Sequence, residues 1–182
     1  MWRSLGSLLV VVGLVAVLAR VCSAPSALGS PTKTAGCVSQ NGLPDLACTP
    51  GATDQRVTQA NIATTICRRG YTTTIRPSLT VTDPIKKDQI AAYGLLGQSQ
   101  SAIVLDHLVP LELGGAPQDM ANLWPEPSNG SANAHMKDSV EHYLNSQVCS
   151  HNMQLGEAQH QIAADWLAVY KSHGLAPAQS PE

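Results

Sequence analysis

The chain has 182 residues, of which 43% are hydrophobic, 13% are charged and 4% are aromatic, and it contains no Phe. This length and composition suit one domain with a modest core, and the low share of charged residues argues against a disordered acidic or basic tail. The formal net charge of −2 argues against tight nonspecific binding to nucleic acid, which depends mainly on Lys and Arg.

The first 24 residues have the order of a secretory signal peptide. Met1-Trp2-Arg3 precedes an apolar run over residues 8–18, and the small residues Ser23 and Ala24 follow. Because this run is shorter than the roughly 20 residues that span a bilayer, no permanent membrane anchor is expected. We expect cleavage near Ser23 or Ala24 and a protein that is secreted or periplasmic. Removing the leader leaves 9 basic residues (11 minus 2) against 13 acidic ones.

Four cysteines remain after the leader, and an even number in an exported chain indicates two disulfides. Of the three pairings that four cysteines allow, we expect Cys37 with Cys48, closing a short loop, and Cys67 with Cys149, joining the ends of two expected helices. A zinc site is the alternative, but none of these thiols forms a C-x-x-C pair.

The segment over 25–56 is rich in Pro, Gly, Ser, Thr and Ala, which predicts a linker followed by a disulfide-held loop. The remaining domain is expected over 57–176. It begins with a short helix over 59–67 behind the N-cap Thr58. The β-branched segment Tyr71–Ile75 predicts a strand, and Asp83-Pro84 together with Gly94 predicts a helix over 84–93.

The next elements form a strand, a turn, a strand and a helix. An apolar run over 102–108 predicts a buried strand that carries Asp106-His107 near its end. Gly114-Gly115 predicts a turn, and residues 122–125 predict a return strand. Helices are expected over 131–148 and 156–171, with Val140, Leu144, Val148, Ile162 and Trp166 among their inward-facing residues. The expected fold class is therefore α+β, with Trp124 and Trp166 in the core rather than stacking on bases.

Asp106, His107, Asn122 and His135 are the residues that indicate chemistry. Hydrolysis of a phosphodiester needs a nucleophilic water and relief of negative charge, which a divalent cation supplies. Asp106 and His135 are the candidate ligands of one such ion, and this donor set accepts magnesium, manganese, nickel or zinc. His107 is the candidate general base, since the pKa of imidazole lies near 6.5. Asn122 is expected to fix the loop and to orient the base.

Several assignments near this set have alternatives. Adjacent strand residues point to opposite faces, so Asp106 and His107 require a twisted or bulged strand end. Ser131, Asn133 or Asp138 could bind the metal in place of His135. Lys137 is either a phosphate ligand or half of a surface pair with Asp138. Glu112 is expected to brace the loop, and the histidines expected to be solvated are His142, His151, His160 and His173.

The segment from Asp106 to Gly115, then Asn122-Leu-Trp-Pro, then His135 resembles the motif of HNH, or His-Me finger, endonucleases. The resemblance covers about a quarter of the chain. It implies a ββα-metal finger over about 102–148, with His107 as base, Asn122 as the loop-fixing residue, and Asp106 and His135 as metal ligands. The C-x-x-C pairs that brace many such fingers on zinc are absent, and the disulfide from Cys67 to Cys149 is the expected substitute.

This resemblance implies a secreted endonuclease that hydrolyses nucleic acid, with DNA the expected substrate and little sequence specificity. Arg76 and Lys137 are the expected substrate contacts. Arg76 belongs to a local cluster of basic residues, although the charges alone favour a solvated face: Arg68, Arg69, Arg76, Lys86 and Lys87. A possible immunity or inhibitor protein is not identified by the sequence.

Two other functions are compatible with the same residues. The first is a binding module that keeps the finger fold without catalysis and recognises a protein or a surface partner, which the net acidic charge favours. The second is a metal-dependent hydrolase of another phosphate ester.

Overall fold

The computed structural model describes residues 28–178, so the expected signal peptide lies outside the described residues. In chain order the elements are the 3-10 helix η1 (Gln59–Thr64), α1 (Tyr71–Ile75), α2 (Leu79–Ala92), η2 (Gln100–Ala102), β1 (Ile103–His107), η3 (Leu111–Leu113), β2 (Leu123–Pro127), α3 (Ala134–Cys149) and α4 (Leu155–Ser172). The fold is α+β, with one small sheet among helices. None of the helices in the described range is long and apolar enough to cross a membrane.

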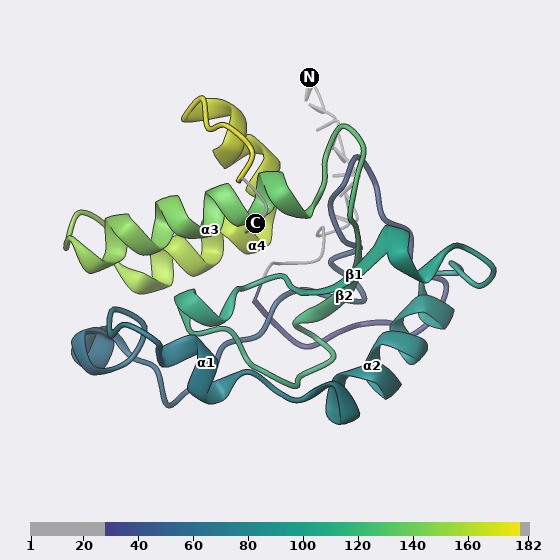
Figure 1. The fold of residues 1–182 in the computed structure, drawn as a ribbon, viewed down its shortest axis with the longest axis horizontal. Coiled ribbons are helices and arrows are strands. Elements are labelled where there is room, and N and C mark those ends of the chain that lie inside the picture. Colours follow the sequence, from purple (N-terminus) through teal and green to yellow (C-terminus); the bar gives the residue numbers. More distant parts are fainter. Residues whose placement is uncertain (1–27, 179–182) are drawn as a thin grey trace, which may run out of the picture.

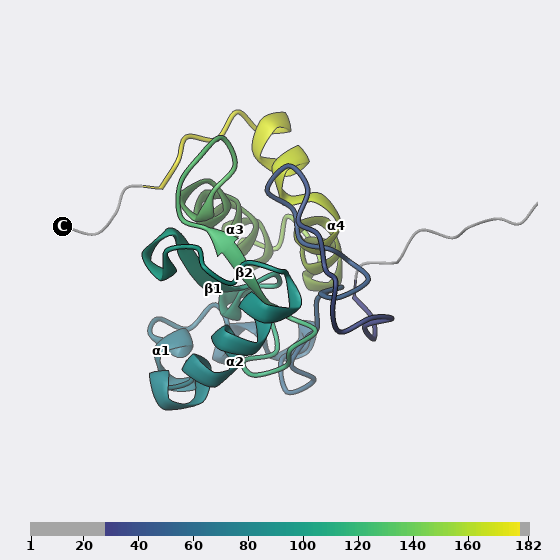
Figure 2. The same ribbon diagram turned by 90° about the vertical axis from the view of Figure 1, so that its right-hand side faces the viewer.

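The two strands form an antiparallel hairpin between two groups of helices. Their register pairs Ile103 with Pro127 and His107 with Leu123. Figures 1 and 2 show α3 and α4 on one side of this hairpin and α1 and α2 on the other. The end of β1 and the loop after it therefore lie at the junction of both helix groups.

The core lies between the hairpin, α3 and α4. Val140, Leu144 and Val148 of α3 are spaced by four residues and are fully buried, as expected from the sequence. Ile162 and Trp166 of α4 are also fully buried, as is the strand residue Trp124. Both Trp side chains therefore fill the core, and neither provides a surface for base stacking.

The prediction of a strand over Tyr71–Ile75 is wrong, because this segment forms the short helix α1. Strand propensity reflects packing against neighbouring strands rather than an intrinsic backbone preference. No strand lies beside this segment within residues 28–178, where the sheet contains only β1 and β2. The hydroxyl of Thr74 instead donates a hydrogen bond to the Tyr71 carbonyl within the turn.

The predicted boundaries of other helices also change. Helix α2 begins at Leu79 behind Ser78, so Asp83 is not its N-cap and Pro84 lies inside it. The proline removes one hydrogen bond to the carbonyl of Thr80, which lies in an exposed turn. Helix α3 begins at Ala134 rather than near residue 131, because the Asn133 side chain accepts a hydrogen bond from the Met136 amide. The first expected helix is the shorter 3-10 helix η1.

The described part of the predicted linker, residues 28–56, supports the loop between the strands. It contains no regular helix or strand, as expected, but Thr53 forms a β-bridge with Gly115. The amide of Gly51 donates to the carbonyl of Ala121, and that of Asp54 donates to the carbonyl of Gly114. This segment therefore holds the loop that carries Asn122.

Both expected disulfides are confirmed, joining Cys37 to Cys48 and Cys67 to Cys149. The first closes the N-terminal loop, and the second fastens the end of α3 to the segment that precedes α1. Disulfides of this kind form and persist in oxidising environments.

The longer disulfide is expected to stabilise the fold more than the shorter one. The sequence separations are 82 and 11 residues. Loop-closure entropy then makes the loss in unfolding free energy about 2 kcal/mol greater for Cys67→Ala/Cys149→Ala than for Cys37→Ala/Cys48→Ala. Urea unfolding of both double variants measures the difference. Equal losses would show that strain or residual structure in the unfolded chain outweighs loop length.

Candidate functional site

The hairpin places the side chains of Asp106 and His107 on opposite faces. Asp106 pairs with Trp124 and His107 pairs with Leu123, and the register from Ile103 to His107 contains no bulge. Directly paired residues share a face, so Asp106 lies on the same face as the buried Trp124. His107 lies on the other face, where it lines a hollow with Arg76 and residues of α2. Of the two geometries expected from the sequence, a twisted or a bulged strand end, the register excludes the bulge, and the two side chains flank the end of β1.

Asn122 fixes the loop between the strands through both ends of its amide. Its Nδ2 donates to the carbonyls of Val109 and Ala116 at 2.9 and 3.1 Å. Its Oδ1 accepts from the amides of Val109 and Ala52 at 2.9 and 3.3 Å. Because Asn122 is fully buried, these bonds have no competition from water. The loop-fixing position expected for Asn122 therefore agrees with its contacts.

The two glycines after η3 are required by the same loop. Gly114 has a φ of +70°, in the left-handed region that favours glycine. A Cβ at Gly115 would lie 1.7 Å from the carbonyl oxygen of Val109 and 2.9 Å from Nδ2 of Asn122. Any side chain at Gly115 would therefore break the bond between Asn122 and Val109.

The imidazole of His107 is buried and has a defined tautomer. Its Nε2 lies 3.0 Å from the carbonyl oxygen of Pro117. Because a carbonyl only accepts, Nε2 carries the hydrogen, and Nδ1 of the neutral ring holds the lone pair. Burial lowers the pKa of His107 below its ordinary value, and the bond to Pro117 and the charge of Asp106 only partly oppose this effect. Burial therefore favours the neutral form of the ring.

Lys137 is the centre of a buried charge cluster. Its side chain has 0% exposure, and its Nζ lies 2.6 Å from Oδ2 of Asp106 and 2.5 Å from Oε1 of Glu141. Nζ also donates to the backbone carbonyl of His107 at 2.8 Å. Desolvation opposes the charge, but Asp106, Glu141 and Glu126 together raise the pKa of Lys137. The ammonium therefore stays charged and joins α3 to the end of β1, and a phosphate could reach it only after displacing these partners.

Glu126 lies near this cluster on the face of the hairpin that carries Asp106. It is 1% exposed, and neither carboxyl oxygen has a hydrogen-bond partner among the described residues. Burial, followed by repulsion from Asp106, raises the pKa of Glu126 well above its ordinary value. Burial of this kind disfavours the charged form of a carboxyl group.

A second hollow of about 300 Å³ opens beside the cluster and is lined by acidic residues and a histidine. Glu112 comes from η3, while Asp138, Glu141 and His142 lie on one side of α3. Burial raises the pKa of Glu112, of Asp138 and of Glu141, and for Glu141 the neighbouring ammonium of Lys137 opposes this rise. Oε1 of Glu112 is buried without a hydrogen-bond partner in the described range. The hollow thus contains oxygen and nitrogen atoms of the kind that bind a cation.

The sequence prediction did not assign Glu141 or His142 to the site and gave Glu112 only a bracing role. Their signal was the spacing of Asp138, Glu141 and His142, which places three polar side chains on one side of a helix. Surface ion pairs on helices produce the same spacing, so the spacing alone does not indicate a site. The structure adds that Glu112 lines the same hollow as these three side chains.

His135 lies at the edge of the site. Its side chain is 46% exposed, and its Nδ1 lies 3.9 Å from Oδ2 of Asp138. Within residues 28–178, no three His, Cys, Asp or Glu side chains are arranged to hold a metal ion. The assignment of Asp106 and His135 as a metal pair therefore remains a prediction.

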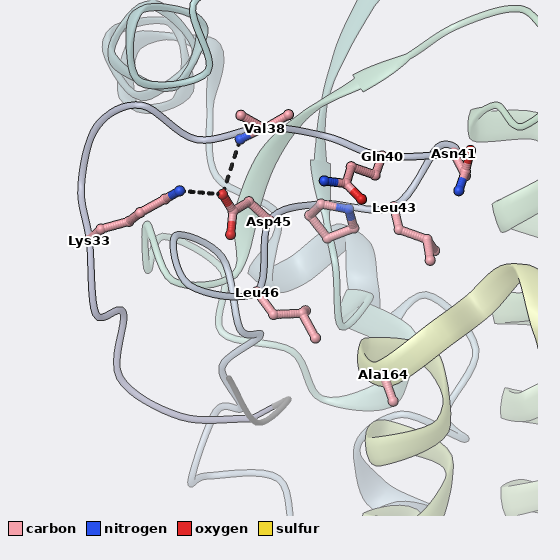
Figure 3. A pocket seen from close by; sticks show the side chains of 9 residues that line it. Lys33, Val38, Gln40, Asn41, Leu43, Asp45, Leu46 and Ala164 are labelled. Carbon is pink, nitrogen blue, oxygen red and sulfur yellow. Dashed lines mark hydrogen bonds and ion pairs between the residues drawn. The ribbon is translucent and has the colours of Figure 1, made fainter. Parts of the chain in front are cut away.

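A larger hollow of about 590 Å³ lies between the N-terminal loop and α4 (Figure 3). The ammonium of Lys33 is paired with Asp45 at 2.7 Å, and the other wall includes Leu43, Leu46 and Ala164. It shares no residue with the two hollows described above. The two charged residues that line it therefore neutralise one another.

No protein-family model matches this chain, and no curated protein or solved structure matches it at a significant level.

Proposed function

We propose that this protein is a secreted, metal-dependent endonuclease of the HNH type that hydrolyses nucleic acid, with DNA the expected substrate. The observation that supports it most is the buried, neutral imidazole of His107. The bond from Nε2 to Pro117 leaves Nδ1 available to accept a proton. His107 and Arg76 line the same hollow, so the base lies beside a guanidinium group suited to a phosphate.

The order of elements supports a ββα finger in this proposal. Strands β1 and β2 form the hairpin, and α3 follows and packs near the loop after β1. Asn122 fixes the intervening loop, and Lys137 joins α3 to Asp106 at the end of β1. The relation between the base, the loop and the helix is therefore set by buried polar bonds.

In the proposed reaction, Nδ1 of His107 accepts a proton from water while the water oxygen attacks phosphorus. The bond between phosphorus and the leaving 3′ oxygen breaks, and that oxygen is protonated from solvent. The 5′-phosphate product follows from the resemblance to HNH enzymes. Arg76 binds a nonbridging oxygen, and Asn122 keeps the loop around His107 in place.

The proposed reaction uses one divalent cation. Asp106 with His135 is the pair implied by the resemblance, and Asp138 and Glu112 offer further oxygen atoms. The observation that favours a cation in this hollow is Oε1 of Glu112, which is buried without a hydrogen bond and lies 3.8 Å from Nε2 of His142. When bound, the ion would supply Lewis-acid stabilisation of the phosphate charge. Magnesium, manganese, nickel and zinc all suit these donors.

A plasmid-nicking assay tests the proposal. Purified protein with both disulfides formed is incubated with supercoiled plasmid and, separately, with each of the four cations or with EDTA. We expect open-circular and linear DNA with at least one cation and no cleavage in EDTA. Intact plasmid under every condition, from protein with a folded circular-dichroism spectrum, would reject the nuclease assignment.

A binding module without catalysis is the second candidate. The observation that favours it is the ion pair between Lys137 and Asp106, because Asp106 already has a cationic partner without a metal. This candidate predicts that the folded protein leaves every nucleic-acid substrate intact in the plasmid assay.

A further inference from the structure

Three hollows on the side of α1 adjoin one another through shared lining residues, and together they are called the groove below. Arg76 lines both the hollow that contains His107 and the acidic hollow beside it. Thr72 and Glu112 line the acidic hollow and a third hollow of about 310 Å³. The groove therefore extends past the candidate base toward the disulfide between Cys67 and Cys149. Residues that line its far end are Arg68, Arg69, Tyr71 and Asn145.

Basic side chains without acidic partners gather along this groove. Arg68, Arg69 and Arg76 are all exposed. Among the described residues, no carboxylate lies within ion-pair distance of these three guanidinium groups, whereas Arg56 is paired with Asp54 at 2.6 Å. A cation that the fold does not neutralise keeps its full attraction for an external anion.

Arg76 links the candidate base to the acidic hollow, because it lines both the hollow that contains His107 and the hollow that contains Glu112. Farther along, Arg68 lies over the ring of Tyr71, with 5.9 Å from its guanidinium carbon to the ring centroid.

We propose that this groove binds the phosphodiester backbone of one nucleic-acid strand, with Arg68 and Arg69 holding phosphates on one side of the phosphate that Arg76 presents to His107. Guanidinium groups suit this role because they bind phosphate oxygens through two parallel hydrogen bonds. The proposal rests on the proposed function for the identity of the strand. It adds a direction in which the strand runs, from β1 along α1 toward the longer disulfide.

The proposal explains how a protein with more acidic than basic residues binds a polyanion. Its contacts are local, because the unpaired arginines lie on one groove. The carboxyl groups of Glu112 and Asp138 on the opposite wall repel the phosphates of the strand. A divalent cation in the acidic hollow should therefore strengthen binding.

The test measures binding separately from cleavage. Fluorescence anisotropy records the affinity for a labelled oligonucleotide, single-stranded and duplex, from 50 to 200 mM salt in EDTA. The variants are Arg68→Gln/Arg69→Gln and the control Lys87→Gln/Lys171→Gln. The control removes the same number of charges from exposed positions that line none of the three hollows.

Loss of two phosphate contacts should reduce the steepness of the salt dependence. The slope of the logarithm of the association constant against the logarithm of salt concentration should become less negative by about 1.4 on single strands or about 1.8 on duplex. The affinity at low salt should fall at least several-fold. The control should keep the slope of the unmodified protein. Equal effects of both double variants, or no binding at 50 mM salt by the folded protein, would overturn the groove proposal.

The groove and the proposed function can fail separately. Selective weakening by Arg68→Gln/Arg69→Gln without plasmid cleavage under any condition supports the groove and rejects the nuclease. Equal plasmid cleavage by both double variants would support the nuclease proposal and reject the groove proposal.

Discussion

Replacement of His107 by Ala is expected to reduce the rate of phosphodiester cleavage by about 10²- to 10⁴-fold. The substitution removes the only imidazole whose tautomer is set by the Pro117 carbonyl within the described part of the chain. No positioned base would then accept the proton of the attacking water, and a bound metal ion and Arg76 would supply the remaining catalysis. The measurement is the initial rate of plasmid nicking at saturating metal.

A matched control for this variant is His160→Ala, which removes an exposed histidine of α4. It should retain the full rate. The thermal unfolding midpoint of His107→Ala must also be measured, so that lost activity is not confused with lost structure. A folded His107→Ala protein with the rate of the unmodified protein would reject His107 as the base.

The same histidine predicts the pH dependence. Burial lowers the pKa of His107, so the base should remain deprotonated below its ordinary value of 6.5. The acidic limb of the pH profile of kcat/KM should accordingly have its midpoint below pH 6.5. A bound cation would lower this midpoint further. Because the unfolded chain takes up this proton more readily, acidification through that range also lowers stability.

Replacement of Lys137 by Met is expected to lower the free energy of unfolding by about 3–5 kcal/mol. The ammonium is fully buried and is the partner of Asp106 and Glu141 at 2.6 and 2.5 Å. Its removal leaves buried carboxylates without a counter-charge and leaves the carbonyl of His107 without its donor. Urea unfolding at pH 7 measures the loss.

Two further variants of the protein serve as controls for this prediction. Lys87→Met removes an exposed lysine of α2 and should change stability by less than about 0.5 kcal/mol. The triple variant Lys137→Met/Asp106→Asn/Glu141→Gln removes the whole charge cluster and should be more stable than Lys137→Met alone, because no unpaired charge remains. A loss below about 1 kcal/mol for Lys137→Met would show that the carboxylates are protonated or solvated without it.

The elements around the site follow from local patterns in the sequence. The apolar run before Asp106-His107 predicts β1, and the residues after Gly114-Gly115 predict β2. The fourfold spacing of Val140, Leu144 and Val148 predicts the buried side of α3, and all three are fully buried. The even number of cysteines limited the disulfides to three pairings, and the expected pairing is the one observed.

The segment Tyr71–Ile75 shows where local patterns fail. Its β-branched residues are typical of a strand, but a strand needs a partner, and none is available beside it in residues 28–178. The start of α2 fails for a related reason. Asp83-Pro84 is a common helix start, yet Ser78 precedes an exposed turn that accommodates the proline inside the helix.

The sequence by itself determined the order of the hairpin and α3 and the position of His107 and Asn122 near the turn, because each depends on neighbouring residues. The even number of cysteines indicated two disulfides but left three pairings open. Only the tertiary structure decided that Lys137 is buried against Asp106, and that Arg68 and Arg69 lie on the groove that reaches His107. Residues 30 positions apart meet only when helices pack, and the charge, pKa and exposure of a side chain depend on those distant neighbours.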